Sequence, residues 1–421
     1  MTAAHSTAEE FRAGARAWLR ANLEPKGTTA ANRGPGHGLT ADALEAQRAR
    51  QRRVFDAGYA GLTVPTAYGG AGLGAEHQRA FNEEAAAFDM PHLGIAGDVT
   101  TDVNVPVLLA HGTEDQKRRW IPPMLRGDEL WVQLLSEPDA GSDLASVRTR
   151  ADREGDHWVI NGAKTWTSGA SLADYGLCLA RTDWEVPKQK GLTWFCVPLR
   201  APGVEIRPIR EINGSEEFCE TFLTDVVVPD DHIVGDPNDG WSIAATLLTF
   251  ERGFAPTEGA ADRARDSIRG FCPDLIALSQ AADTLNDSHV RQLLARAHVN
   301  DWMHRHLLHH LATEVARHER PALAAAAFIK LSRGINDSQR ARTTMEIAGP
   351  SAISWDPDDD AGHRPSTDYL NGRIFAIAGG SNQIQRNIIS ERILGLPREP
   401  AVDNNRPFSE VLRHVRQDPK R

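Results

Sequence analysis

The hydrophobic pattern of this 421-residue chain changes period near Leu130 and changes back near residue 240, and this feature most constrains its fold. Before Leu130, apolar residues recur at the spacing of amphipathic helices. The middle region instead has short runs of β-branched and aromatic residues separated by Pro, Gly and Asp, a pattern typical of an antiparallel barrel or sandwich. The sequence therefore predicts an α+β chain with a helical domain at 1–129, a β domain at 130–238 and a helical bundle at 239–421.

The first predicted helix has clear signals at both ends. Thr7 and Glu10 have the spacing of a capping box, and Pro25 with Gly27 ends the apolar run. The apolar residues expected on one face of this helix are Phe11, Ala15, Trp18 and Leu19. Two further helices are expected at residues 42–58 and 74–87.

The middle region is expected to form short strands. Asn161-Gly162 is a strong two-residue turn signal, so it predicts a hairpin between strands at 157–160 and 165–168, with Trp166 and Ser168 on one face. The other expected strands span residues 175–180, 192–199, 204–209 and 219–228.

The last third predicts an up-and-down four-helix bundle. Its expected helices span residues 241–271, 289–318, 321–348 and 382–394. Between the last two helices, residues 349–368 carry three prolines and the acidic run Asp358–Asp360, and are expected to form a loop.

Composition excludes several classes of function. The formal net charge of -10 and the absence of a Lys/Arg stripe argue against a nucleic-acid-binding protein. No apolar run approaches the ~18 residues that a membrane span needs, and the N-terminus lacks a signal-peptide pattern, so a cytoplasmic protein is expected. The cysteines have no C-x-x-C spacing, which favours neither a zinc site nor a disulfide framework. These cysteines are Cys178, Cys196, Cys219 and Cys272.

Two segments of the middle region suggest a ligand site. Residues 133–143, QLLSEPDAGSD, end an apolar run in small hydroxyls and glycine, whose backbone N–H groups can approach a phosphate or a polar ring edge. Residues 158–168, WVINGAKTWTS, add tryptophan and further hydroxyls. Together they suit a flat, anionic, redox-active ligand.

These segments resemble the acyl-CoA dehydrogenase family of flavoproteins. Their order and spacing carry the resemblance together with GLTVPTAYGGAGLG (61–74), GLTWFCVPL (191–199), EFCETFLTDVVVPDDHIVGDPNDGW (217–241) and GGSNQIQRNIISERILGLP (379–397). The resemblance implies helices, then a β domain, then a four-helix bundle. It also implies oxidation of an acyl-CoA thioester to its 2,3-enoyl form, with proton loss from the α-carbon and hydride transfer to FAD.

The resemblance also implies which residues contact FAD. These are Gln133, Leu135, Ser136, Gly141, Ser142, Trp166, Ser168, Ser381 and Gln383, with Ser142 also directed at the acyl-CoA. Gln133 and Leu135 are expected to act mainly through backbone groups. Several of the others have an ordinary structural reading as well: Ser136 and Ser142 suit turns, Trp166 a core, Ser168 a strand, and Ser381 a helix N-cap.

The catalytic base is expected at Glu251. Many family members carry a Glu just before the Gly-Thr/Ser of the C-terminal motif, where this chain has Gly379; other branches carry it where this chain has Glu251. Apolar neighbours there would raise the pKa of the carboxyl group and strengthen the base. Arg252 and Gly379 are expected near the substrate. The competing interpretation is that Glu251 pairs with a cation such as Arg252 on a solvated helix face.

One family element is missing. Residues 279–287 contain neither Arg nor Phe, where many members have Arg-x-x-Phe-Gly reaching the FAD pyrophosphate across a subunit interface. The resemblance implies an electron-transfer flavoprotein as electron acceptor and a homodimer or homotetramer. Three alternatives stay open: a non-catalytic or half-site subunit of a hetero-oligomer, a flavin oxidase, and a dehydrogenase of carrier-protein thioesters.

Three other patterns are given little weight. Gly69–Gly74 resembles a dinucleotide fingerprint but lacks the preceding strand, so a tight loop is expected. His306 and His310 lie one helical turn apart without a carboxylate partner in the pattern. Asp358–Asp360 lacks the spacing of a calcium loop. No metal site is predicted.

Overall fold

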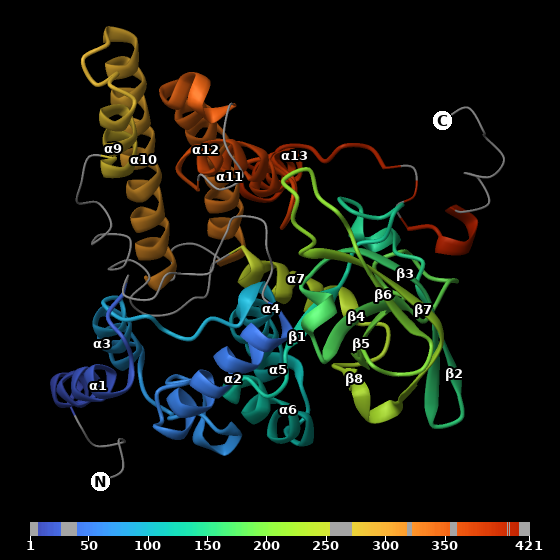
Figure 1. Cartoon of the computed structure of the whole chain (residues 1–421). Coiled ribbons are helices and arrows are strands. Elements are labelled where there is room, and N and C mark those ends of the chain that lie inside the picture. The colour runs from blue at the N-terminus through green and yellow to red at the C-terminus, as the bar shows by residue number, and fades with distance from the viewer. Residues whose placement is uncertain are drawn as a thin grey trace.

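The computed structural model describes residues 7–26, 40–252, 272–317, 322–353, 360–401, 403 and 405–411. It has a helical N-terminal part, a β-sheet in the middle of the chain and a helical C-terminal part (Figure 1). In that view the sheet lies to one side of the N-terminal helices, and the C-terminal helices lie across the top of both. Within the described residues, no helix is long and apolar enough to cross a membrane.

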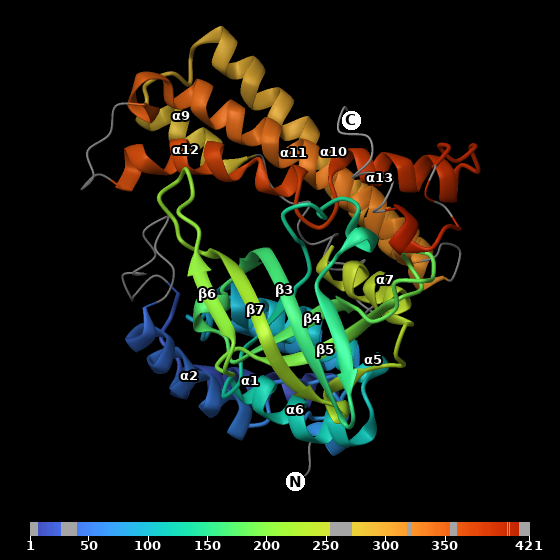
Figure 2. The same ribbon diagram turned by 90° about the vertical axis from the view of Figure 1, so that its right-hand side faces the viewer.

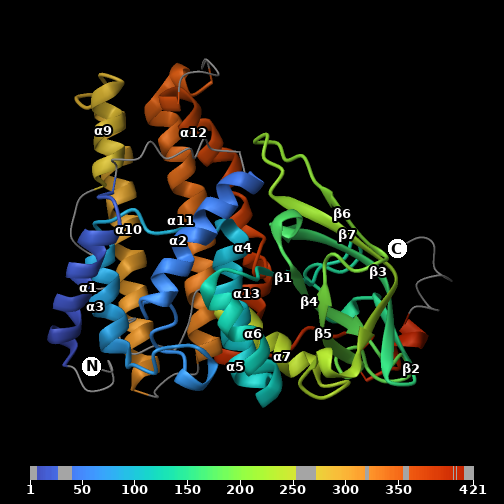
Figure 3. The same ribbon diagram turned by 60° about the horizontal axis from the view of Figure 1, so that its bottom comes forward.

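The N-terminal part contains α1 (Ala8–Asn22), α2 (Ala41–Asp56), α3 (Ala75–Ala85), α4 (Gly94–Val99), α5 (Val105–His111) and α6 (Glu114–Arg126). The predicted capping box is confirmed, since the backbone N–H of Glu10 donates to the Thr7 hydroxyl and that of Thr7 donates to the Glu10 carboxylate. Such caps are worth about 1 kcal/mol. Figure 3 shows α1 and α3 lying side by side, as their packing requires.

The sheet consists of β1 (Trp131–Leu134), β2 (Arg150–Glu154), β3 (His157–Ser168), β4 (Tyr175–Arg181), β5 (Leu192–Pro198), β6 (Val204–Pro208), β7 (Phe218–Pro229) and β8 (Ile233–Val234). Their order is β6-β7-β3-β2-β4-β5-β8, with β1 paired to β4. Most pairs are antiparallel, but β1 and β2 each pair with β4 in parallel, which the strand pattern alone did not predict.

The predicted hairpin at Asn161-Gly162 is wrong, because β3 runs through both residues and the turn comes earlier, at Gly155 (φ 69°). Asn161 exchanges hydrogen bonds with Asp225 on β7, where the register shifts by a bulge. Gly162 is needed for packing, since a side chain there would collide with Thr149. The prediction failed because glycine also occurs in strands where another segment of backbone approaches closely, which is its role at Gly162.

The C-terminal part contains α7 (Gly240–Glu251), α9 (Pro273–Ala281), α10 (Ser288–Ala316), α11 (Ala322–Ala348), α12 (Asp360–Asn371) and α13 (Asn382–Ile388). Helix α11 is central, since α9, α10, α12 and α13 all contact it. The long helices run over one end of the sheet, and α7 lies between them and the sheet (Figure 2). Of the helix predicted at 241–271, residues 253–271 lie outside the described part.

The loop predicted at 349–368 is wrong in its second half, where α12 begins at Asp360 with Pro365 inside it. Packing of α12 on α11 outweighs the proline penalty, as tertiary context often does. Asp358 and Asp359 lie outside the described residues. Cys178, Cys196 and Cys219 are buried in strands, as predicted.

Candidate functional site

The loop after β1 is fastened to the middle of β3. The backbone N–H of Thr165 donates to the carbonyl of Ser136 at 2.9 Å, and Glu137 exchanges backbone hydrogen bonds with Ala140. This turn presents the half-buried Ser136 next to the end of β3 that carries Trp166. The structure therefore brings together two of the residue groups that the sequence assigned to one site.

A buried ion pair holds that loop in place. Lys164 on β3 lies 2.9 Å from the Glu137 carboxylate and also donates to the carbonyls of Leu135 and Leu179. Burial would raise the pKa of Glu137, but the Lys164 charge and hydrogen bonds from Thr149 and Arg148 hold this pKa below its ordinary value. Sequence reasoning missed this pair. Its signal was a lysine directly before the strand predicted at 165–168, within what proves to be one continuous strand.

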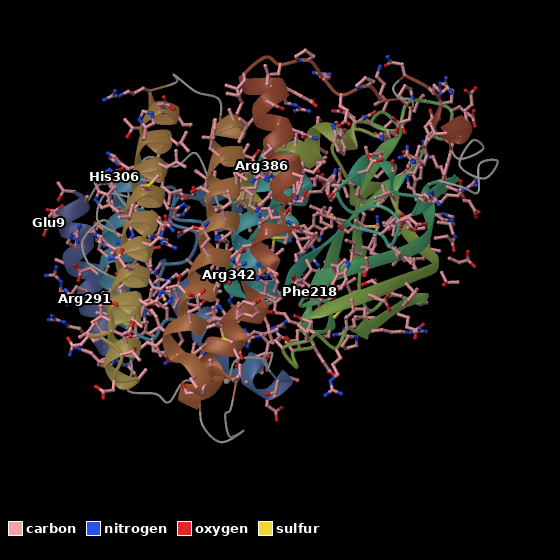
Figure 4. All side chains as sticks on the ribbon, turned by 90° about the horizontal axis from the view of Figure 1, so that it is seen from above. Glu9, Phe218, Arg291, His306, Arg342 and Arg386 are labelled. Atoms are coloured by element: carbon pink, nitrogen blue, oxygen red, sulfur yellow. The ribbon has the colours of Figure 1, made fainter. Side chains whose placement is uncertain are left out.

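Trp166 is exposed over 58% of its surface and has a left-handed backbone (φ 61°). A bulky residue in that conformation is strained, and such strain gathers at ligand sites. It arises where β3 and β7 lose register between Lys164 and Thr167. Trp166 packs edge-on against Phe218, with ring centroids 5.9 Å apart. Figure 4 shows Phe218 at the side of the sheet that faces the C-terminal helices. The alternative reading of Trp166 as a core residue is contradicted by this exposure.

Gly141 and Ser142 lie on an exposed turn beyond Ala140. A side chain added at Gly141 would meet nothing within 4 Å, so the space beside this turn is open. The turn is anchored behind Ser142, where Asp143 accepts hydrogen bonds from Ser146 and from Lys188. This arrangement leaves the glycine and the serine hydroxyl free to meet a ligand.

Glu251 is the last residue of α7, and the residue is partly buried. Its Oε2 atom is buried and accepts no hydrogen bond from any described residue. Burial raises the pKa of the Glu251 carboxyl group, although the charges of Arg252 and Lys330 act to lower it. The alternative of an ion pair with Arg252 on a solvated helix face does not agree with the burial of the Arg252 side chain, whose Nε–H donates to the carbonyl of Gly379.

Gly379 lies directly beside this carboxylate. A Cβ atom at Gly379 would be 3.6 Å from Oε1 of Glu251 and 3.1 Å from Cε of Lys330. Gly379 has a left-handed backbone (φ 65°), and its carbonyl accepts hydrogen bonds from Arg252 at 3.1 Å and Gln385 at 3.3 Å. The predicted grouping of Glu251, Arg252 and Gly379 is thus observed as a cluster.

Ser381 is the N-cap of α13, where its hydroxyl accepts a hydrogen bond from the backbone N–H of Ile384. Gln383 is exposed, whereas the buried glutamine of this motif is Gln385. Gln385 and Lys330, both of which support the Gly379 turn, were missed from the sequence. For Lys330 the signal was a charge directly after the alanine-rich, apolar start of a predicted helix.

Residues 279–287 contain the last residues of α9 and the turn that leads to α10, closed by a hydrogen bond from the Thr284 backbone N–H to the Ser279 carbonyl. Asp287 then caps α10. The segment lacks Arg and Phe. This turn therefore provides no cationic side chain that could contact a pyrophosphate.

The patterns given little weight have ordinary partners. His310 lies 3.3 Å from Glu314, and the ring of His306 packs on Trp302 at 4.0 Å between centroids. Gly69–Gly74 forms a tight loop before α3, with backbone hydrogen bonds to residues 61–65. In the part of the chain with described side chains, no cluster of three metal-ligating residues occurs.

The middle-domain residues fit the ring of a flavin. Trp166 offers an exposed flat aromatic surface, and Nε2 of Gln133 is buried without a hydrogen-bond partner among the described residues. A buried donor of this kind requires a ligand or water as its acceptor. The hydroxyls of Ser136 and Ser168 lie on the adjoining segments.

Comparison with known proteins gives matches along nearly the whole chain. Residues 5–128, 133–226 and 238–394 match the family models described as the N-terminal, middle and C-terminal domains of acyl-CoA dehydrogenase. The chain is 40% identical to acyl-CoA dehydrogenase IpdE1 of Mycobacterium tuberculosis over 93% of this chain and 98% of that protein.

Two solved structures are also similar. One, described as the Tcur3481-Tcur3483 steroid ACAD, has a TM-score of 0.74 at 30% identity and covers 93% of this chain and 98% of its own. The other, from the ChsE4-ChsE5 complex of M. tuberculosis, has a TM-score of 0.68 at 29% identity and covers 95% of this chain and 100% of its own.

Proposed function

This chain belongs to the acyl-CoA dehydrogenase family of oxidoreductases, and from that premise we propose that Glu251 is the base that removes the α-proton of an acyl-CoA thioester. The observation that carries the proposal is the buried, unpaired Oε2 of Glu251. A carboxylate in an ion pair is stabilised as an anion and is a weaker base, whereas burial makes proton uptake more favourable. The raised pKa of Glu251 is consistent with that role.

The FAD-binding residues are part of the same proposal. Ser136, Ser168 and Trp166 would hold the ring system, and the buried amide of Gln133 would donate to it. Gly141 and Ser142 would lie nearer the phosphates and the acyl-CoA, while Leu135, Ser381 and Gln383 complete the set. Bound FAD supplies the acceptor for the β-hydride. An electron-transfer flavoprotein is the proposed next acceptor.

The acyl group is proposed to be bulky. Gly379 has no side chain beside Glu251, at the position where the family resemblance implies a glutamate in many members. The similarity to a protein described as a steroid ACAD favours a polycyclic or branched acyl group over a short straight chain. A panel of acyl-CoA thioesters in which only short straight chains turn over would contradict this.

A second candidate is that the active protein is a hetero-oligomer, to which this chain contributes the base. Residues 279–287 lack the Arg and Phe that would reach the pyrophosphate, so the cation would have to come from elsewhere, and in this candidate a different chain supplies it. Both similar structures named above are described by two chain names, which favours this candidate over a homotetramer.

The visible absorbance spectrum of the purified protein tests the proposal. We expect a flavin band that bleaches on anaerobic addition of the acyl-CoA panel. Glu251→Gln should retain the band and bind the thioester but fail to bleach. Bleaching by Glu251→Gln at the wild-type rate would remove Glu251 from the role of base. A colourless protein that gains flavin and activity only with a second chain would favour the hetero-oligomer. Peroxide release during turnover would identify an oxidase.

A further inference from the structure

Lys330 is a buried cation close to the proposed base. It lies on α11, which contacts α7, and only 6% of its surface is exposed. Its Cε atom approaches to 3.1 Å of the position that a Gly379 side chain would take, on the same side as Glu251. Burying a lysine is costly, so its retention needs a reason.

The Lys330 ammonium does not take the Glu251 carboxylate as its hydrogen-bond partner. It donates to the carbonyl of Phe375, at the start of the segment that leads to Gly379. The far end of that segment is held by Arg252 and Gln385, which donate to the carbonyls of Gly379 and Gly380. The segment beside the base is therefore tied at both ends by buried donors.

The charges around the base come from several elements. Arg252 on α7 and Lys330 on α11 act directly on Glu251. Arg333 and Asp337, also on α11, act on Lys330, and Arg392 after α13 acts on Arg252. Burial lowers the pKa of Lys330, and the Glu251 charge opposes that change.

We propose that Lys330 is a positioning residue that ties the segment from Phe375 to Gly380 beside Glu251 and keeps a fixed positive charge near the base without pairing with it. The inference rests on the proposed role of Glu251. A charge held at this distance favours the anionic carboxylate, while the absence of a hydrogen bond leaves Oε2 accessible to a proton. Burial and this charge then act in opposite directions on the pKa of the base.

The test is the pH dependence of the rate of flavin reduction in the holoenzyme, supplied with a second chain if activity requires one. Lys330→Met retains the aliphatic stem but removes the charge and the donor. Because the pKa of Glu251 should then rise, we expect the acid limb of the profile to move up by roughly one pH unit. Lys330→Arg, which keeps the charge, should leave the acid limb near its wild-type position.

Arg342→Met is the matched control. Arg342 is an exposed cation on the same helix (Figure 4), so its loss changes the net charge equally and should leave the limb in place. An unchanged limb in Lys330→Met, or an equal shift in Arg342→Met, would overturn the inference. The proposed function would fail separately, if Glu251→Gln reduced flavin normally.

A second measurement does not depend on turnover. The raised pKa of Glu251 makes the free energy of unfolding fall as pH rises from the ordinary carboxyl pKa to the folded value. When residue 251 is Glu, Lys330→Met should extend this decrease in the free energy of unfolding to higher pH. When residue 251 is replaced by Gln, Lys330→Met should have no such effect. The same pH dependence in both backgrounds would show that Lys330 does not act on Glu251.

Discussion

Gly379 and Glu251 occupy adjoining space, since a Cβ atom at Gly379 would lie 3.6 Å from Oε1 of Glu251. The resemblance to the acyl-CoA dehydrogenase family implies a base at one or the other of these two positions in different branches, and in this structure the two positions lie side by side. If Glu251 is the base, as proposed, a side chain at residue 379 would take up space next to its carboxylate.

Gly379→Ala tests this relationship. The left-handed φ of 65° should cost about 1–2 kcal/mol of stability for any side chain. The methyl group would also crowd Cε of Lys330 and come into contact with Glu251, so we expect slower flavin reduction, most of all with bulky acyl groups. Stability is measured by thermal unfolding, and reduction by stopped-flow absorbance.

Gly395→Ala is the control for Gly379→Ala. Gly395 has a similar φ of 69°, and a side chain there would meet nothing within 4 Å. Gly395→Ala should therefore lose a similar amount of stability but reduce flavin at the wild-type rate. Equal kinetic effects in both variants would mean that backbone strain alone, rather than space beside Glu251, explains Gly379.

The pH dependence of activity should reflect the raised pKa of Glu251. The base is active only when deprotonated, so the rate of flavin reduction should fall as pH drops through a value above the ordinary carboxyl range. The acid limb should be absent in Glu251→Gln, whose residual rate has no such base. A limb at the ordinary carboxyl pKa would contradict the burial of this group.

Breaking the buried Lys164–Glu137 pair should be strongly destabilising. Lys164→Met leaves the Glu137 carboxylate buried without its cation, which costs about 3–5 kcal/mol. Because the folded pKa of Glu137 is lowered, its stabilisation is present above the ordinary carboxyl pKa and lost as pH falls through the folded value. Urea unfolding at several pH values measures both effects.

Asp152→Asn is the comparison for Lys164→Met. It breaks an ion pair with Arg150, in which both side chains are about half exposed. Such surface pairs contribute less than about 1 kcal/mol. If Lys164→Met were no worse than Asp152→Asn, the loop bearing Ser136 would not depend on the buried pair.

Local sequence signals predicted much of the fold because they act over a few residues. Thr7 and Glu10 form the expected capping box, and the change of period near Leu130 marks the passage from α6 to β1. The errors arose where distant contacts decided the outcome. Gly162 looked like a turn but allows Thr149 to pack closely, and Pro365 looked like a loop residue but lies in a helix held by α11.

The site was predicted unevenly for the same reason. Glu251, Arg252 and Gly379 could be named because the family motifs mark them, and the structure brings them together. Lys330 and Gln385 act through backbone carbonyls of another segment, and no local pattern shows such a bond. The strained backbone of Trp166 likewise arises from a register shift against a strand far along the chain.

Phe408 should hold the C-terminal segment around it against the β domain. This packing should in turn stabilise the turn that bears Ser142. Its ring lies 3.9 Å from the buried guanidinium of Arg181, which in turn donates to the carbonyls of Ala145 and Val147. Lys188 also bridges Asp143 of that turn to Asp403. We expect Phe408→Ala to cost about 3 kcal/mol or more and to increase hydrogen exchange at both segments.

The matched control for Phe408→Ala is Glu410→Ala, which truncates an exposed side chain two residues further along. It should leave hydrogen exchange unchanged. Phe408→Ala could increase hydrogen exchange in the C-terminal segment while the amides of residues 141–147 exchange as slowly as in the wild type. That result would mean that the turn holds the C-terminal segment but does not depend on it. Weaker binding of the acyl-CoA by Phe408→Ala with normal binding by Glu410→Ala would instead connect this C-terminal segment to the ligand site, through the Arg181 hydrogen bonds and the Lys188 bridge.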